Sequence, residues 1–350
     1  MEKLKVVCTA QITEEYRNKL DARFDMKYTG WAVKDGWILN EEECVEAFRD
    51  ADILIVGVDH VTREVLDKCP NVKMISCPRG NPVNIDVKAA AERGIPVSFT
   101  PGRNANSVAE FLLGAVIGFT RYIPLSYHEV RNGRFLAPAS RDIYRVPEKD
   151  DIVWGFAMTP PETPFMAYYG YELYRRRFGM IGYGAVGRRL NRFLQALEME
   201  VVIYDPYLDP AVAEADGVKM LSMDEVISTS EFVSLHCKVT PETKGMFGKR
   251  EFELMRPDAV FINTARGVIV DQKALIDALE QKKIRGAVID VFWQEPMPAN
   301  HPLLKMDNVV MTPHIAGASN DVARHQSVMV YEDIEAFVEG RPLKYQFRVK

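Results

Sequence analysis

The segment Gly182-Tyr183-Gly184-Ala185-Val186-Gly187 places three glycines at the spacing GxGxxG. An apolar run, residues 177–182, precedes it, and a segment with helical periodicity, residues 186–197, follows it. A strand–turn–helix of this kind cradles a pyrophosphate, because glycine permits the tight turn and the helix N-terminus supplies free N–H groups. The motif therefore predicts a dinucleotide site that includes Gly182, Gly184, Ala185, Val186 and Gly187.

Asp205 follows Gly187 by 18 residues and comes directly after a second apolar run, residues 200–204. A carboxylate at this place accepts hydrogen bonds from the adenosine ribose and repels the 2′-phosphate of NADP. The pattern thus favours NAD as the cofactor. The alternative is that Asp205 only caps the strand before Pro206.

Strand-like and helical segments alternate along the chain in two series. The first series of β-branched runs comprises residues 4–8, 51–56, 72–76 and 97–99, and the second comprises 177–182, 200–204, 232–235, 259–262, 286–289 and 309–311. Such alternation predicts βαβ units and parallel sheets, and the second series has the pattern of a complete doubly wound sheet. A long helix is expected over 107–122 with Ser107 as its N-cap, and a last helix over 321–339.

Composition limits the possible functions. A chain of 350 residues suggests two domains, and a net charge of -5 argues against a nucleic-acid partner. The longest strongly apolar stretch, residues 111–119, is about half of what a membrane span requires. The five cysteines are scattered and form no CxxC pair. They predict neither disulfides nor a metal site, and reduced thiols favour a cytoplasmic protein.

Seven motifs then occur in a fixed order, and they carry a family resemblance. They are Asn84-Ile85-Asp86, residues 104–110 (NANSVAE), the GxGxxG with Asp205-Pro206-Tyr207, His236 with residues 240–243 (TPET), residues 262–267 (INTARG), Asp290-Val291-Phe292 with Glu295-Pro296, and residues 312–317 (TPHIAG). Over nearly its whole length the chain resembles the D-isomer-specific 2-hydroxyacid dehydrogenases, a family with phosphoglycerate, glycerate and lactate members.

The resemblance implies an α/β architecture of two Rossmann-like, doubly wound parallel-sheet domains around an active-site cleft. Residues 108–317 would form the NAD-binding domain, and residues 1–107 with 318–350 the substrate-binding domain. An arm-like insertion is expected near residues 131–170. Family members usually form homodimers through the cofactor domain, which predicts the same for this chain.

The resemblance also implies hydride transfer between the nicotinamide and C2 of a small 2-hydroxy or 2-oxo acid. Arg266 would hold the carboxylate and carbonyl oxygen with its planar fork. His314 would act as the acid/base, and Glu295 would bond the other ring nitrogen and fix its tautomer. The structural alternatives are an ion pair for Arg266 and an exposed loop charge for Glu295.

Further residues receive roles from the same resemblance. Backbone N–H groups near Gly80 and Asn81 would hold the substrate carboxylate, together with Arg266 and His314. The nicotinamide ring would be oriented by Thr264, Ala265 and Asp290. The remaining cofactor contacts are expected from Pro206, His236, Cys237, Lys238, Thr243 and Gly317.

Arg79 departs from the family pattern. The substrate loop is Arg79-Gly80-Asn81-Pro82-Val83, where most relatives have Val-Gly-Val-Asp. We consider two interpretations of the added cation: a contact with a polar or phosphorylated tail of the substrate, or an ion pair with a protein carboxylate. Lys238 replaces part of another usual motif, and it either covers the pyrophosphate or faces solvent.

Other functions remain to be weighed against the dehydrogenase. A non-catalytic NAD(H)-sensing interaction protein of the corepressor type would keep the same Arg–Glu–His set, so only turnover separates the two. A formate enzyme would have Gln in place of Glu295 beside its histidine. Metal-dependent hydrolysis has no supporting ligand cluster.

Overall fold

The chain folds into two compact units. The structure, a computed structural model, describes residues 3–136 and 163–348. Unit 1 comprises Met1–Ser107 and Gly317–Lys350, and unit 2 comprises Val108–Ala316. Each unit is built on its own parallel sheet, so the α/β fold class with two doubly wound sheets is confirmed. The predicted domain limits differ from those of the units at Gly317, which the structure groups with unit 1.

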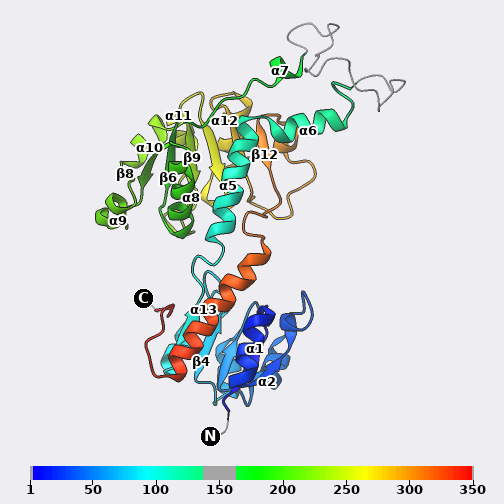
Figure 1. Cartoon of the computed structure of the whole chain (residues 1–350), viewed down its shortest axis with the longest axis vertical. Coiled ribbons are helices and arrows are strands. Elements are labelled where there is room, and N and C mark those ends of the chain that lie inside the picture. Colours follow the sequence, from blue (N-terminus) through cyan, green and yellow to red (C-terminus); the bar gives the residue numbers. More distant parts are fainter. Residues whose placement is uncertain (1–2, 137–162, 349–350) are drawn as a thin grey trace, which may run out of the picture. The chain divides into compact units, whose positions relative to one another are not determined.

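The described residues of unit 1 form five strands and five α-helices, and Figure 1 shows how they are arranged. In chain order they are β1 (Lys5–Cys8), α1 (Glu14–Arg23), β2 (Asp25–Tyr28), the 3-10 turn η1 (Gly30–Ala32), α2 (Glu41–Phe48), β3 (Ile53–Ile55), α3 (Arg63–Lys68), β4 (Met74–Cys77), α4 (Val87–Glu92), β5 (Val97–Phe99) and α13 (Asn320–Val338). The central strand β3 is short, and its three residues are all apolar, as expected for a sheet that is buried on both faces.

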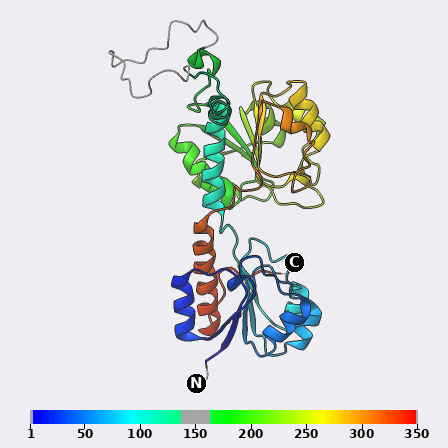
Figure 2. The ribbon, with the colours of Figure 1, turned by 90° about the vertical axis from the view of Figure 1, so that its right-hand side faces the viewer.

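The sheet of unit 1 has the order β2-β1-β3-β4-β5, and all its strands are parallel. Helices α1 and α13 cover one face, and α2, α3 and α4 cover the other (Figure 2). The strand order reverses between β1 and β3, which makes the carboxyl ends of these two strands the topological switch point of the sheet.

A buried carboxylate ties the loops together at this switch point. Asp59 follows β3 and has no exposed surface. Its Oδ2 accepts a hydrogen bond of 2.5 Å from Thr9 Oγ1, after β1, and its Oδ1 accepts one of 2.7 Å from the Leu39 N–H. Because a buried charge is stable only when its lone pairs are satisfied, Asp59 fixes the course of these loops.

Unit 2 contains α5 (Ala105–Thr120), most of which lies within it, followed by α6 (Ile123–Arg131), α7 (Pro164–Ala167), β6 (Arg177–Ile181), α8 (Ala185–Ala196), β7 (Glu200–Tyr204), α9 (Pro210–Ala215), β8 (Lys219–Met220), α10 (Met223–Thr229), β9 (Phe232–Leu235), α11 (Lys249–Leu254), β10 (Val260–Asn263), η2 (Gly267–Ile269), α12 (Gln272–Glu280), β11 (Gly286–Ile289), η3 (Pro302–Lys305) and β12 (Val309–Met311). Side-chain caps fix several helix starts, for example the capping box of Ser222 and Glu225 on α10.

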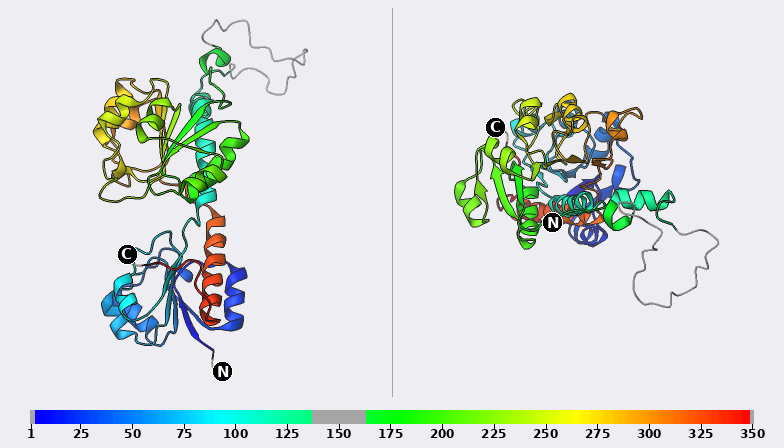
Figure 3. Two further views of the ribbon diagram at one scale, coloured as in Figure 1. Left: turned by 90° about the vertical axis from the view of Figure 1, so that its left-hand side faces the viewer. Right: turned by 90° about the horizontal axis from the view of Figure 1, so that it is seen from above.

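The seven-stranded parallel sheet of unit 2 has the order β12-β11-β10-β9-β6-β7-β8. Helices α5 and α8 pack on one face, and α10, α11 and α12 pack on the other (Figure 3). The order reverses between β6 and β9. Ligands of doubly wound sheets bind outside the carboxyl ends of the strands at such a reversal.

Some sequence predictions need correction. The helix predicted over 107–122 begins at Ala105, so Ser107 lies inside α5 and is not its N-cap. Strands β2 and β8 were not predicted. Of the insertion expected near residues 131–170, residues 137–162 lie outside the described part of the chain. No single described helix is long and apolar enough to cross a membrane, and α5 with α6 passes that test only as a bent pair.

Candidate active site

Three neighbouring strands, β9, β6 and β7, bring the predicted cofactor residues to one edge of unit 2. Gly182 follows β6, Asp205 follows β7 and His236 follows β9. The three strands are hydrogen-bonded neighbours in parallel register, so their carboxyl ends lie together. Residues separated by more than fifty positions in the sequence thus meet at the switch point of the sheet.

Glycine is required where the chain turns from β6 into α8. Gly182 has a φ of +89°, and a Cβ atom on it would lie 2.8 Å from the Cys237 backbone nitrogen. A Cβ on Gly187 would approach Tyr183 Cδ2 to 3.3 Å. Gly184, by contrast, is the N-cap of α8 and has open space where a Cβ would stand. This open cradle, with the N-terminus of α8 carrying Ala185 and Val186 in its first turn, fits a bound pyrophosphate.

Asp205 closes the turn at the end of β7. Its Oδ2 accepts a hydrogen bond of 2.9 Å from the Tyr183 N–H, and its Oδ1 accepts one of 2.9 Å from the Tyr207 N–H. The carboxylate therefore links the glycine turn to the segment of Pro206. Each carboxylate oxygen has a second lone pair, so these bonds leave acceptors for ribose hydroxyls.

His236 forms the wall opposite Gly182. Burial lowers the pKa of its imidazole to about 4. Its Nε2 is buried and has no hydrogen-bond partner among the described residues. The ring is therefore neutral at physiological pH and does not act as the acid of the site. An orphaned buried nitrogen at this edge is a second feature that fits a bound cofactor.

The loop after His236 is held by its own side chains. Thr243 Oγ1 donates a hydrogen bond of 2.7 Å to the Lys238 carbonyl and accepts one of 2.8 Å from the Thr240 N–H. Cys237 is half-buried, whereas Lys238 is exposed. The structure thus leaves the Lys238 side chain free to reach a ligand or solvent.

The residues expected to do chemistry follow the other neighbouring strands, β10, β11 and β12. Arg266 comes after β10, Glu295 after β11 and His314 after β12. The register pairs Asn263 of β10 with Ile289 of β11, and Ile289 with Met311 of β12. The three loops therefore leave the sheet side by side.

Glu295 and His314 form a hydrogen-bonded pair. Glu295 Oε2 lies 2.6 Å from His314 Nδ1, and Glu295 Oε1 accepts a hydrogen bond of 2.9 Å from the Phe292 N–H. Partial burial raises the pKa of the Glu295 carboxyl, but the bonds from His314 and Phe292 outweigh it and lower the pKa overall. The ionised carboxylate can only accept, so Nδ1 carries the proton and Nε2 is left for another partner.

Arg266 lies close to this pair. Its loop is shaped by Asn263, whose side chain donates to the Arg266 carbonyl at 3.0 Å and accepts from the Ala265 N–H at 3.0 Å. The loop packs tightly, since a Cβ on Gly267 would lie 2.3 Å from the Phe292 backbone. The positive charge of Arg266 contributes to the lowered pKa of Glu295. Thr264 and Ala265 are partly exposed in the same loop.

Asp290 has a clear role within the protein. It has no exposed surface, and its Oδ1 accepts hydrogen bonds from Thr312 Oγ1 at 2.6 Å and from the Ile315 N–H at 2.8 Å. Its Oδ2 accepts one of 2.8 Å from the Ala316 N–H. Asp290 therefore positions the loop that carries His314. Its expected contact with the nicotinamide stays a prediction.

The predicted substrate loop belongs to unit 1. Arg79, Gly80 and Asn81 follow β4, and the Arg79 carbonyl accepts a hydrogen bond of 2.9 Å from the Thr100 N–H. Gly80 and Asn81 are exposed. Among residues 3–136 and 163–348, no carboxylate forms a salt bridge with Arg79, so the ion-pair interpretation has no partner there. Gly317 is grouped with unit 1 and directly follows Ala316, the last residue of unit 2.

Comparisons with known proteins agree with this geometry. Residues 162–316 match the family model described as D-isomer specific 2-hydroxyacid dehydrogenase, NAD binding domain. The chain is 32% identical over 339 residues to a glyoxylate reductase of Korarchaeum cryptofilum, covering 97% of this chain and 94% of that protein. It is 33% identical over 304 residues to a D-3-phosphoglycerate dehydrogenase of Methanocaldococcus jannaschii, covering 86% of this chain and 52% of that protein.

The protein belongs to the D-isomer-specific 2-hydroxyacid dehydrogenase family. It is an NAD-dependent oxidoreductase that acts on the CH–OH group of its donor. A solved structure of the TT0316 protein from Thermus thermophilus is similar as well, with a TM-score of 0.78, 27% sequence identity and coverage of 99% of this chain and 100% of that one.

Sequence reasoning missed several residues that position this dehydrogenase's site. Thr312 donates a hydrogen bond to Asp290, and the Phe292 N–H donates one to Glu295. Asn263 shapes the loop that carries Arg266. Thr312 and Asn263 stand inside motifs quoted above, so their place in those motifs was the available signal. No cluster of three or more metal-ligating side chains occurs in the described part of the chain.

We predict that Gly182→Ala abolishes measurable NADH binding. An added Cβ at 2.8 Å from backbone atoms after β9 would push the glycine turn away from its position, and φ at +89° is strained for alanine. Titration of NADH fluorescence would measure this. Gly184→Ala is the matched control for a steric clash within the protein, because a Cβ on Gly184 would have no atom of a non-neighbouring residue within 4 Å. Equal NADH affinity of Gly182→Ala and wild type would contradict the prediction.

We also predict a specific pH dependence of stability from His236. Its pKa is about 4 in the folded chain and ~6.5 when unfolded, so below pH ~6.5 the unfolded chain binds more protons. The free energy of unfolding should therefore fall as pH decreases from ~6.5 towards 4. His236→Gln removes this contribution, and its urea midpoint should depend less on pH over that range. An imidazole of His236 that titrates near pH 6.5 by NMR would contradict the assignment.

Proposed function

We propose that this dehydrogenase interconverts a small 2-oxo acid and its D-2-hydroxy acid, with Arg266, Glu295 and His314 as the reacting groups. The observation that supports this most directly is the 2.6 Å contact between His314 Nδ1 and Glu295 Oε2, next to the exposed guanidinium of Arg266. In this proposal unit 2 binds the cofactor and unit 1 contributes the substrate loop.

The bound nicotinamide supplies or accepts the hydride at C2. In the direction of reduction, Arg266 holds the carboxylate and polarises the carbonyl with two parallel N–H donors, which lysine cannot do. His314 gives its Nε2 proton to the carbonyl oxygen as the hydroxyl forms. Glu295 stays ionised and stabilises the imidazolium before that transfer. The reverse direction returns the proton to Nε2.

The substrate itself is a small acid, and we propose that its tail is polar or phosphorylated. Arg79 is the support, since it adds a cation to the substrate loop and no described carboxylate neutralises it. Gly80 and Asn81 are exposed residues, and their backbone N–H groups would bind the carboxylate at C1.

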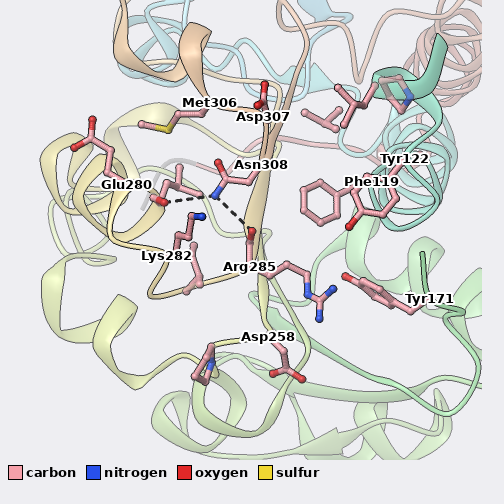
Figure 4. A pocket seen from close by; sticks show the side chains of 17 residues that line it. Phe119, Tyr122, Tyr171, Asp258, Glu280, Lys282, Arg285, Met306, Asp307 and Asn308 are labelled. Carbon is pink, nitrogen blue, oxygen red and sulfur yellow. Dashed lines mark hydrogen bonds between the residues drawn. The ribbon is translucent and has the colours of Figure 1, made fainter. Parts of the chain in front are cut away.

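We further propose a homodimer formed through unit 2. On α6 the apolar side chains of Ile123, Tyr127 and Val130 are exposed by 53%, 67% and 45% at helical spacing. Beside them lies a cavity of about 780 Å³, in which Phe119 and Tyr122 face Arg285 and Tyr171 (Figure 4). Arg285 precedes β11, so this surface lies at the amino ends of the strands and leaves the cofactor edge free.

The central test is oxidation of NADH at 340 nm with glyoxylate, hydroxypyruvate, pyruvate and longer sugar-derived 2-oxo acids. We expect turnover by wild type and a loss of ~10²–10⁴-fold in kcat for His314→Ala, because general acid catalysis is removed. Glu295→Gln should lose less, and its kcat should show a changed pH profile. NADH binding of each variant and the activity of His128→Ala serve as controls. Tight NADH binding without turnover of any acid would overturn the proposal and favour an NAD(H) sensor.

For the tail, we expect Arg79→Ala to raise KM about tenfold for acids with a hydroxylated or phosphorylated tail, since a charge-assisted contact is lost. Arg49→Ala, an exposed arginine of the same unit, is the matched control. Unchanged KM for every polar-tailed acid would exclude the contact.

For the dimer, light scattering of wild type should give twice the chain mass. Tyr127→Asp places a charge in the α6 surface and should give monomers, whereas Leu304→Asp, which alters an exposed apolar side chain elsewhere in unit 2, should not. A wild-type monomer at all concentrations would contradict this proposal.

A further inference from the structure

A second cavity, of about 550 Å³, lies wholly within unit 1. It is formed at the carboxyl ends of β1 and β2 and at the first turn of α13, and its lining includes Gln11, Thr13, Arg17, Trp31, Arg103 and Ser319. None of these residues has a role in the hydride transfer derived above. The lining brings together two guanidinium groups, those of Arg17 and Arg103, and one carboxylate, that of Asp35.

Two residues of the lining, Trp31 and Thr13, each have a buried polar atom without a partner among the described residues. They are Trp31 Nε1 and Thr13 Oγ1. The indole N–H can only donate. Because buried donors are normally satisfied, these two atoms beside one cavity are donors that a bound group would complete.

Two guanidinium groups line the same cavity. Arg17 Nε donates to the Ile12 carbonyl at 3.1 Å, and Arg103 Nη1 donates to the Gln326 side chain. Neither forms a salt bridge with a carboxylate in the described part of the chain. The carboxylate of Asp35, the acid in the lining, accepts a bond of 3.1 Å from Gln11 Nε2.

Two residues of α13 hold Arg103 in position. Gln326 is buried and donates through Nε2 to the Gln11 carbonyl at 2.6 Å, while His325 Nδ1 lies 3.0 Å from the Arg103 carbonyl. Burial lowers the pKa of Arg103, and the charge of Arg79 lowers it further. Its surroundings thus penalise its charge, although an arginine remains protonated. An anion in the cavity would offset this penalty.

The position of the cavity relative to the sheet also favours ligand binding. The loops after β1 and β2 contribute Gln11, Thr13 and Trp31 to the lining, so the cavity lies on the carboxyl side of the sheet. Ligands of open parallel sheets bind on that side.

We propose that this cavity binds the phosphate or carboxylate group of a small molecule, with Arg17, Arg103, Trp31 Nε1 and Thr13 Oγ1 as its donors. Oxygen-rich anions accept several hydrogen bonds at once, which matches a lining of four donors. The group belongs either to the far end of the 2-oxo acid, in which case the inference rests on the proposed function, or to a separate small anion.

Direct binding can be measured on the full chain by NMR of the four tryptophan indole N–H groups, with Trp31→Phe assigning the Trp31 signal. The probes are inorganic phosphate and 3-phosphohydroxypyruvate. We expect a saturable downfield shift of the Trp31 signal with at least one probe. Its affinity should fall at least about tenfold in Arg103→Gln and in Thr13→Val, which keeps the side-chain shape. Arg49→Gln is the matched control.

A kinetic comparison distinguishes the two sources of the anion. If the group is the substrate's tail, the ratio of kcat/KM for 3-phosphohydroxypyruvate to that for glyoxylate falls at least about tenfold in Arg103→Gln. If it is a separate anion, this ratio stays at the wild-type value while phosphate binding is lost. Either result supports the site.

Two results overturn the site: no change of the Trp31 signal with either probe, or equal affinities in wild type, Arg103→Gln and Thr13→Val. Failure of the dehydrogenase proposal is separately visible. Wild type would then turn over no acid, while the Trp31 signal still responds to the probe.

Discussion

The buried carboxylate of Asp290 fixes the geometry on which the proposed catalytic residues depend. A charge without solvent is stable only when donors surround it, and Asp290 obtains three of them from the segment 312–316. These bonds determine the path of that segment, including the left-handed backbone of His314 at φ +58°, which a non-glycine residue seldom adopts. The imidazole is thereby directed to Glu295. The pair is a consequence of the loop's path and not of the two side chains alone.

The parallel sheet supplies the second constraint. Because the described strands of unit 2 all run in one direction, the loops at their carboxyl ends open at the same edge, and six of these loops carry candidate site residues there. Close packing between the loops then sets their separation. Gly182 lies against the backbone after β9, and Gly267 lies against the backbone after β11. A side chain at either position would move one loop relative to its neighbour, and the site would lose its spacing.

The sequence predicted those parts of the fold that local patterns encode. The apolar strands of both sheets and the glycine turn were visible because their signals are contiguous. Strands β2 and β8 were missed because they are short and half-exposed, with no apolar run. The start of α5 at Ala105 was missed because a plausible cap, Ser107, stood two residues later. The pairing of Glu295 with His314 came from the family resemblance, since the 19-residue separation of the two carries no signal for a contact that depends on sheet register. The role of Asp290 was hidden because its partners are mostly backbone groups.

The two units differ in whether the polar groups of their candidate sites have hydrogen-bond partners within the protein. In unit 2 the polar groups of the candidate site are already paired: His314 with Glu295, and Asp290 with the loop that carries His314. Such pairing orients a reacting group and costs no reorganisation during the reaction. Beside the cavity of unit 1, the donors Trp31 Nε1 and Thr13 Oγ1 have no hydrogen-bond partner in the described part of the chain, and the guanidinium of Arg103 has no counter-charge there. Donors left incomplete in this way gain most from a ligand that completes them. The chemistry proposed for this enzyme would thus lie in unit 2, and the anion site proposed in unit 1 would serve binding alone.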